Sequence, residues 1–176
     1  MLFIDLETNG LGPDCTLLEC GMVLTCDDPQ LTFVDDLSFL FEVDVDAAFD
    51  AASEYVQQMH TDNGLWEALL QQDMGIAHSQ AGLIIGQFLD AHGVQGKVEA
   101  AGWSVHADLA WLKGIGAADR LSHRVYDVST LRTTVQQLHG AWAPPPVQPK
   151  AHRALADCYE ALHYARWFRQ HVVRSA

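Results

Sequence analysis

Basic residues are scarce in this sequence, with 10 Lys and Arg against 23 Asp and Glu and a formal net charge of −13. Residues 1–96 contain 17 acidic residues and no Lys or Arg, whereas residues 97–176 contain 10 basic and 6 acidic residues. Binding of long DNA by counterion release needs many Lys and Arg contacts to phosphate. The charge pattern therefore disfavours a long nucleic acid as ligand. It leaves open a short one, or one held through bound cations.

Paired cysteines and long apolar segments are also missing. The four cysteines form no CxxC pair and the nine histidines do not stand at zinc-finger distances from them, so neither a zinc site nor a disulfide framework is predicted. No stretch approaches the roughly 18 apolar residues of a membrane span, and no signal-peptide pattern follows Met1. We therefore expect a reduced, cytoplasmic protein with no membrane partner.

The 176 residues, 49% of them apolar, are enough for one well-buried core, and a single domain over residues 1–176 is predicted. Apolar runs bounded by turn residues predict five strands, at residues 2–6, 17–25, 37–45, 98–103 and 124–128. Apolar residues at helical spacing predict five helices, at residues 45–59, 81–89, 108–113, 129–138 and 155–172. The proline-rich stretch 144–149 predicts a loop. Neighbouring strands followed by alternating helices and strands predict an α/β fold with a mixed sheet.

The strand-like run near the start of the chain carries two carboxylates. Asp5 and Glu7 are two residues apart, so the strand period points both to the same face. Unpaired carboxylates are costly to bury, and a hard divalent cation is the usual partner for such a pair. The alternative is an ordinary edge strand with one solvated face.

Three further residues extend this pair. Asp108 lies just beyond a predicted strand, and Asp157 lies on the C-terminal helix five residues after His152. Five residues correspond to about 500° of helical turn, so His152 and Asp157 can converge only if His152 belongs to the loop or first turn. Together these residues give four carboxylates and one histidine in the order Asp, Glu, Asp, His, Asp.

Five segments carry a family resemblance, and they occur in the family's order along nearly the whole chain. They are FIDLETNGL, SEYVQQMHTDNGL, AGWSVHADLAWL, YDVSTL and KAHRALADCYEAL. This pattern resembles the DEDDh family of 3′–5′ exonucleases, and within it the oligoribonuclease branch. The resemblance implies an RNase H-like fold with a mixed five-stranded sheet flanked by helices, in agreement with the predicted element order.

The resemblance also implies a reaction. Asp5, Glu7, Asp108 and Asp157 match the family's metal-binding carboxylates, which hold two divalent cations, Mg²⁺ or Mn²⁺. His152 matches the general base. Two such ions can polarise a scissile phosphate and activate water, and an imidazole can accept the proton near neutral pH. The implied products are nucleoside 5′-monophosphates.

Five outer positions are matched as substrate-binding residues. Leu11 matches a leucine that wedges against a terminal base, and Tyr55 stands where the family usually has a stacking tryptophan. Ser104 and Ser129 match hydroxyls near the substrate phosphate, and Arg124 a basic residue that closes over the far end of the substrate. Leu11 could instead be turn packing, and Ser129 a helix N-cap.

Four tryptophans, Trp103, Trp111, Trp142 and Trp167, are expected to be packing residues in the core or under a loop rather than a binding platform. His106 is expected to be an ordinary polar residue near the start of a helix.

The leading functional hypothesis is a metal-dependent 3′–5′ exonuclease acting on short single-stranded RNA, and possibly DNA, as a homodimer in which Arg124 acts on the partner's site. The turn after Glu7 reads Thr8-Asn9, where oligoribonucleases usually have Met-Thr. This difference moves the motif towards DNA-editing relatives, so a DNA-directed 3′–5′ exonuclease is the first alternative. A catalytically silent nucleic-acid-binding protein is the second.

Overall fold

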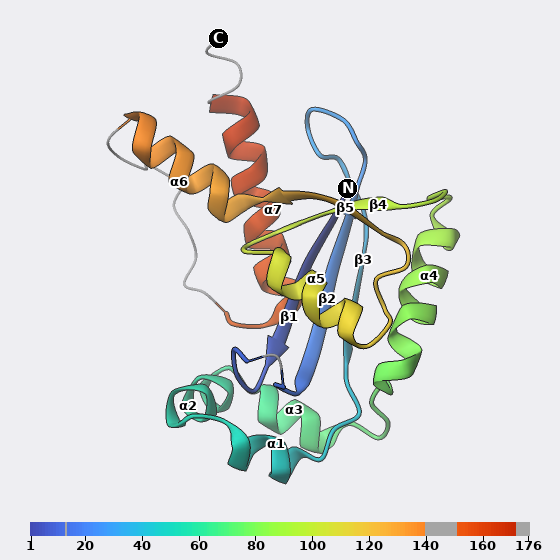
Figure 1. Cartoon of the computed structure of the whole chain (residues 1–176), viewed down its shortest axis with the longest axis vertical. Coiled ribbons are helices and arrows are strands. Elements are labelled where there is room, and N and C mark those ends of the chain that lie inside the picture. Colours follow the sequence, from blue (N-terminus) through green and yellow to red (C-terminus); the bar gives the residue numbers. More distant parts are fainter. Residues whose placement is uncertain (13, 140–150, 172–176) are drawn as a thin grey trace.

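The computed structural model describes residues 1–12, 14–139 and 151–171, and an open five-stranded sheet forms its centre (Figure 1). The strands are β1 (Leu2–Thr8), β2 (Leu17–Thr25), β3 (Phe33–Leu40), β4 (Val98–Gly102) and β5 (Leu121–Asp127). Their order across the sheet is β3-β2-β1-β4-β5. The pairs β1–β2 and β2–β3 are antiparallel, whereas β4 is parallel to both β1 and β5. The predicted mixed α/β sheet is confirmed, and it is consistent with an RNase H-like fold.

Helices cover both faces and one end of the sheet (Figure 1). They are α1 (Val45–Ala51), α2 (Glu54–Asp62), α3 (Leu65–Gln71), the 3₁₀ turn η1 (His78–Gln80), α4 (Ala81–Ala91), α5 (His106–Gly114), α6 (Val128–His139) and α7 (Ala154–His171). Among the described residues, none of these helices combines the length and apolar character needed to cross a membrane.

The central strand β1 separates two apolar layers. Leu2, Ile4 and Leu6 pack on the face covered by α4 and α5. Phe3 packs on the opposite face against α7. Because side chains alternate along a strand, the residues at positions 5 and 7 lie on the same face as Phe3. The sheet thus directs two carboxylates towards α7.

The sheet edges differ from the predicted bounds. The third strand was predicted at 37–45 but spans Phe33–Leu40, because its pairing with β2 extends through Asp35 and Asp36. Acidic side chains are tolerated there because β3 is an edge strand. Asp44 accepts a hydrogen bond from the Ala47 N–H and starts α1, which ends the extended segment. The fifth strand, predicted at 124–128, lies at Leu121–Asp127.

The helix predicted at 45–59 is two helices. Ala52 and Ser53 are extended, and the Ser53 hydroxyl accepts a hydrogen bond from the Val56 N–H, so α2 has its own N-cap. Helix α3, which follows Gly64 at φ +75°, was not predicted. The C-terminal helix agrees with prediction through residue 171. The predicted loop at 144–149 and the predicted packing residue Trp142 lie outside the described residues.

Candidate active site

Three carboxylates meet on the α7 face of the sheet. Asp5 and Glu7 belong to β1, and Asp157 lies in the first turn of α7. Ligand oxygens of these residues lie within 4.8 Å of one another. Glu7 and Asp157 are buried and Asp5 is partly exposed. Because carboxylates this close repel one another when charged, a bound cation would stabilise the cluster.

This donor set fits a divalent cation. Carboxylate oxygens are the hard ligands that Mg²⁺ and Mn²⁺ prefer, and such ions are usually held by a few carboxylates together with water and substrate phosphates. Asp5 and Glu7 come from one strand and Asp157 from a helix that packs on it. The cluster is therefore held by the core rather than by a loop.

Asp108 is placed by a different contact. It lies in the first turn of α5, and its Oδ1 accepts a hydrogen bond of 3.0 Å from the Leu6 N–H on β1. Its side chain is buried, and that burial raises its pKa to about 7, with repulsion from Asp127 acting in the same direction. The structure thus joins Asp108 to the main chain between Asp5 and Glu7, outside the three-carboxylate group.

The raised pKa of Asp108 predicts a pH-dependent stability. In metal-free protein the native state retains this proton to about pH 7, whereas an unfolded Asp loses it near 3.8. The native state then binds more protons between these values, so the free energy of unfolding falls as pH rises through them. An Asp108→Asn variant, with chelator present, is expected to exceed wild-type stability by about 1–4 kcal/mol at pH 8.

The advantage of Asp108→Asn should be nearly gone at about pH 3, where Asp108 is mostly neutral in the native and the unfolded state alike. Urea unfolding at the two pH values measures this difference. An equal stability offset at both pH values would instead show that the substitution acts through packing.

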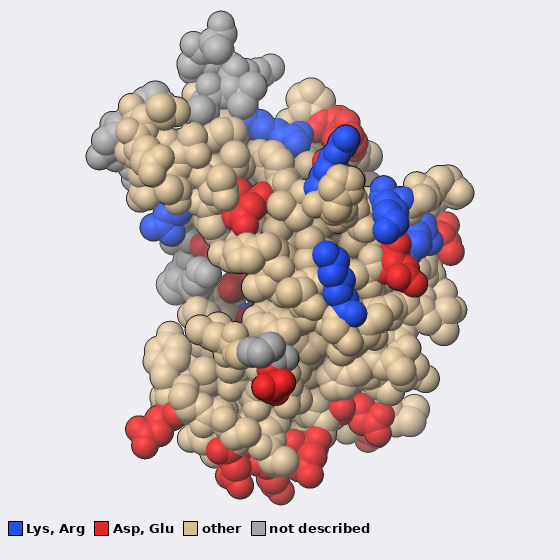
Figure 2. All heavy atoms as spheres, viewed as in Figure 1, with Lys and Arg blue, Asp and Glu red and all other residues tan. Residues whose placement is uncertain are grey.

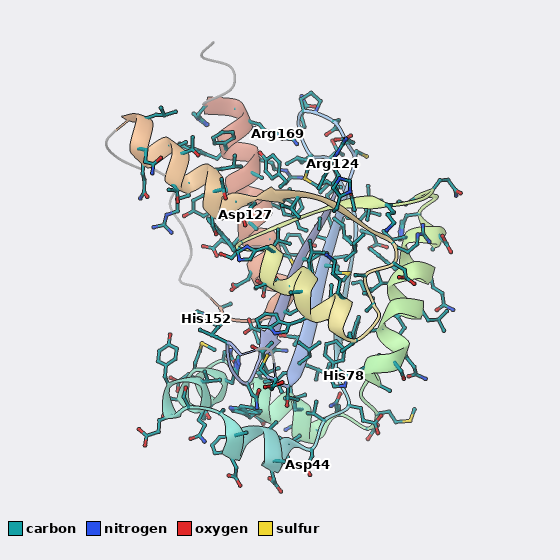
Figure 3. All side chains as sticks on the ribbon, in the orientation of Figure 1. Asp44, His78, Arg124, Asp127, His152 and Arg169 are labelled. Carbon is teal, nitrogen blue, oxygen red and sulfur yellow. The ribbon has the colours of Figure 1, made fainter. Side chains whose placement is uncertain are left out.

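His152 stands two residues before α7, as predicted for a residue at the loop-to-helix junction. Figure 3 shows it on the segment that leads into this helix. Its backbone is left-handed, with φ +46°, and its carbonyl oxygen accepts a hydrogen bond from the Asn63 side-chain amide. The neighbouring His60 is fully buried, with Nε2 4.0 Å from Glu7 Oε2. Burial lowers the pKa of His60, and the proximity of His152 lowers it further.

A cavity of about 590 Å³ lies beside the carboxylates. Of the predicted site residues, it is lined by Asp5, Glu7, Leu11, Tyr55, Ser104 and Asp108. Leu11 and Tyr55 are 94% and 72% exposed, so most of each side chain is available for contact. In Figure 2 acidic side chains are visible deep in a hollow on the left of the molecule. The cavity thus joins exposed apolar and aromatic surface to the carboxylates.

The remaining predicted substrate residues are placed differently. Ser129 contacts Ser104, with 3.1 Å between their hydroxyl oxygens and 3.0 Å from the Ser104 N–H to Ser129 Oγ. The alternative that Ser129 caps α6 is wrong, because Asp127 accepts the hydrogen bond from the Thr130 N–H. Arg124 is exposed on β5, well separated from His152 in Figure 3. Within one chain, the structure does not bring Arg124 to this cavity.

Sequence reasoning missed several residues of this region. Trp103 and Trp111, expected to be packing residues, line the cavity, although Trp103 also packs edge-on against Tyr164. His60 gave no distinguishing signal, because one histidine on a helix is usually structural. His106 stands at the start of α5 as expected, with an exposed side chain 3.5 Å from Asp127.

Fold and site together define a class: an RNase H-like α/β protein with a carboxylate cluster on its central strand that suits divalent cations. No protein-family model matches the chain. The chain is 29% identical to the oligoribonuclease of Bordetella pertussis, over 99% of this chain and 96% of that protein. It is 25% identical to the oligoribonuclease of Chromobacterium violaceum, with the same coverage. It is also 29% identical to that of Mycobacterium ulcerans, over 97% of this chain and 80% of that protein.

These relatives come from several bacteria and align over nearly the whole chain. They support assignment of the chain to the oligoribonuclease family, as its five motifs indicated.

Proposed function

We propose that this chain is a metal-dependent 3′–5′ exoribonuclease that hydrolyses short RNA to nucleoside 5′-monophosphates. The observation that carries the proposal is the Asp5, Glu7 and Asp157 cluster beside an open cavity, in a chain similar to oligoribonucleases. We include all 176 residues in one exonuclease domain.

Four carboxylates and one histidine have roles in this proposal. Asp5, Glu7, Asp108 and Asp157 would hold two divalent cations, Mg²⁺ or Mn²⁺. When bound, these ions would supply polarisation of the scissile phosphate and a lowered pKa of the attacking water. His152 would accept the proton of that water as its oxygen forms a bond to phosphorus. The bond from phosphorus to the 3′ oxygen of the preceding nucleotide would then break, and that oxygen would take a proton from solvent and remain as the 3′-hydroxyl of the shortened chain. The released product would be a nucleoside 5′-monophosphate.

The cavity lining supports recognition of only a few nucleotides. Tyr55 offers an exposed ring on which a base can stack, and Leu11 offers an exposed apolar side chain in the same cavity lining. Ser104, which lines the cavity, would donate a hydroxyl hydrogen bond to a substrate phosphate, and Ser129, whose hydroxyl oxygen lies 3.1 Å from that of Ser104, would do so from beside the cavity. With no Lys or Arg in residues 1–96, this part of the chain has no cationic side chain to hold a longer backbone.

A homodimer would complete the site. Arg124 is exposed on the edge strand β5, away from its own cavity, so it could reach a substrate only in another molecule. In the proposed dimer, Arg124 would pair with a phosphate at the far end of the substrate in the partner's site. The chain would be cytoplasmic.

Substrate length and sugar test the proposal. We expect dinucleotides and other oligomers below about six residues to be hydrolysed at least tenfold faster than strands of about twenty, because stacking is available for one or two bases only. Labelled RNA and DNA of both lengths should be incubated with Mg²⁺ or Mn²⁺, and the products resolved by size.

A rate that climbs with length, or a preference for DNA, would favour the DNA-directed exonuclease. Binding without hydrolysis in either metal would favour the catalytically silent protein.

A further inference from the structure

The segment that carries His152 and leads to Asp157 is held by contacts that the proposed chemistry does not use. Helix α7 begins at Ala154, and the Arg153 carbonyl accepts the first helical hydrogen bond from the Asp157 N–H, at 3.0 Å. Arg153 therefore stands between the proposed base and the proposed metal ligand, bonded through its backbone to both. A contact that holds Arg153 in place therefore also restrains the positions of His152 and Asp157.

Glu19 fixes Arg153 from the neighbouring strand. Its carboxylate accepts three hydrogen bonds from the guanidinium: Nε donates to Oε2 at 3.0 Å and to Oε1 at 3.2 Å, and Nη2 donates to Oε1 at 2.8 Å. Glu19 Oε2 also accepts a hydrogen bond of 3.0 Å from the Ala154 N–H. Glu19 is 5% exposed, and its hydrogen bonds raise the pKa of Arg153. A planar bidentate pair of this kind fixes both orientation and distance.

Strand register places this contact beside the carboxylate cluster. Glu19 on β2 lies directly opposite Glu7 on β1, and Gly21 lies opposite Asp5. A Cβ at Gly21 would meet the Ala154 carbonyl carbon and the Leu155 nitrogen at 2.4 Å, so the start of α7 rests on bare backbone there. The same two β2 positions that face the β1 carboxylates therefore hold the helix that delivers Asp157.

A second contact holds the other side of the segment. The Asn63 side-chain amide donates to the His152 carbonyl, and its Oδ1 accepts the Leu65 N–H at 2.9 Å. His152 is thus fixed in a left-handed conformation that an L residue adopts only when neighbouring contacts impose it. The contacts on both sides leave the segment little freedom to shift.

We propose that Glu19, acting through Arg153, is a positioning residue that sets His152 and Asp157 against Asp5 and Glu7. This inference rests on the proposed function and adds to it a pair that touches neither metal nor substrate. Outer contacts that orient metal ligands are commonly worth about 10- to 100-fold in metal affinity or activity.

Two Arg153 variants and one Glu19 variant test the pair. Arg153→Met keeps the aliphatic stem and loses the guanidinium, and Glu19→Gln keeps the shape and loses the charge. Both are expected to lower kcat by about 10- to 100-fold with little change in KM, and to weaken Mn²⁺ binding in calorimetric titration. Arg153→Lys keeps a positive charge near Glu7 without the bidentate geometry. Its kcat should therefore fall well below that of wild type if position, rather than charge, matters.

Arg166→Met is the matched control. Arg166 also anchors α7, through hydrogen bonds to the carbonyls of Gln30 and Leu31 at 3.1 and 2.7 Å, but on the β2–β3 loop rather than beside the cluster. Its loss should lower thermal stability about as much as Arg153→Met, while kcat and Mn²⁺ affinity stay near wild-type values. Equal losses of kcat in the two variants would reduce Arg153 to a general stabilising residue and overturn the proposal.

A double variant tests the route through His152. If Arg153 acts by placing His152, the loss in His152→Asn with Arg153→Met should be smaller than the product of the single losses. Multiplicative losses, or wild-type kcat and Mn²⁺ affinity in Arg153→Met, would overturn the proposal.

Failure of the proposed function would give a different result, because the wild-type chain would then leave oligonucleotides intact. The Mn²⁺ titrations would still report on positioning, and an absence of Mn²⁺ binding by wild type would overturn both.

Discussion

Replacing Asp5 or Asp157 with Ala is expected to reduce hydrolysis by roughly a thousandfold or more. Each residue contributes an oxygen to the only three-carboxylate group found among the described residues. Charge stabilisation by a bound ion contributes several kcal/mol to a transition state, and each 1.36 kcal/mol is about a factor of ten in rate. Excess chelator should have the same effect on wild-type protein. The measurement is release of nucleoside 5′-monophosphate from a labelled dinucleotide.

Asp73→Asn supplies the control for this experiment. Asp73 is an exposed acid in the loop after α3, so its removal changes the net charge as much and leaves the cluster intact. Its rate should match wild type. Substantial hydrolysis by Asp5→Ala or Asp157→Ala in added Mn²⁺ would contradict the metal-ligand assignment. Far-UV circular dichroism would establish that both variants remain folded.

The inner strands could be predicted from the sequence because their own residues specify them. Strands β1 and β2 are apolar runs with turn residues between them; β2 has its predicted bounds, and β1 starts as predicted but continues two residues further, to Thr8. The edge strands were misplaced by several residues, since Asp35 and Asp36 enter β3 only through pairing with β2. Apolar spacing likewise continued across Ser53, where a local side-chain cap starts a new helix. Partner strands and caps set the bounds that periodicity alone could not.

The candidate site also has features that the sequence predicts and features that it does not. The two-residue spacing of Asp5 and Glu7 predicted that they share a face, and helical geometry predicted that His152 precedes the helix of Asp157. The contact between Glu19 and Arg153 joins positions 134 residues apart, and nothing local marks either residue. The cavity-lining role of Trp111 depends on how α5 packs beside the turn after β1. Such long-range contacts follow only from the assembled fold.

Replacing His152 is expected to cost less than removing a metal ligand. If His152 accepts the proton of the attacking water, its loss should lower kcat by about 10²- to 10⁴-fold, the usual contribution of one proton-transfer group. An Ala at this position would also occupy a left-handed backbone, at φ +46°. Asn tolerates that conformation better, so His152→Asn separates loss of the base from backbone strain. Both variants should retain metal binding and show similar losses of kcat.

Added imidazole distinguishes a missing base from a displaced segment. A small base that enters the space left by the side chain should restore part of the activity of His152→Ala, whereas it cannot restore a misplaced Asp157. His106→Ala is the control, because His106 is an exposed histidine at the start of α5 and should be dispensable. Wild-type turnover in both His152 variants, together with a loss in His106→Ala, would move the proton-accepting role to His106. Because Asn63 holds the His152 carbonyl rather than its ring, the segment itself should keep its place in either variant.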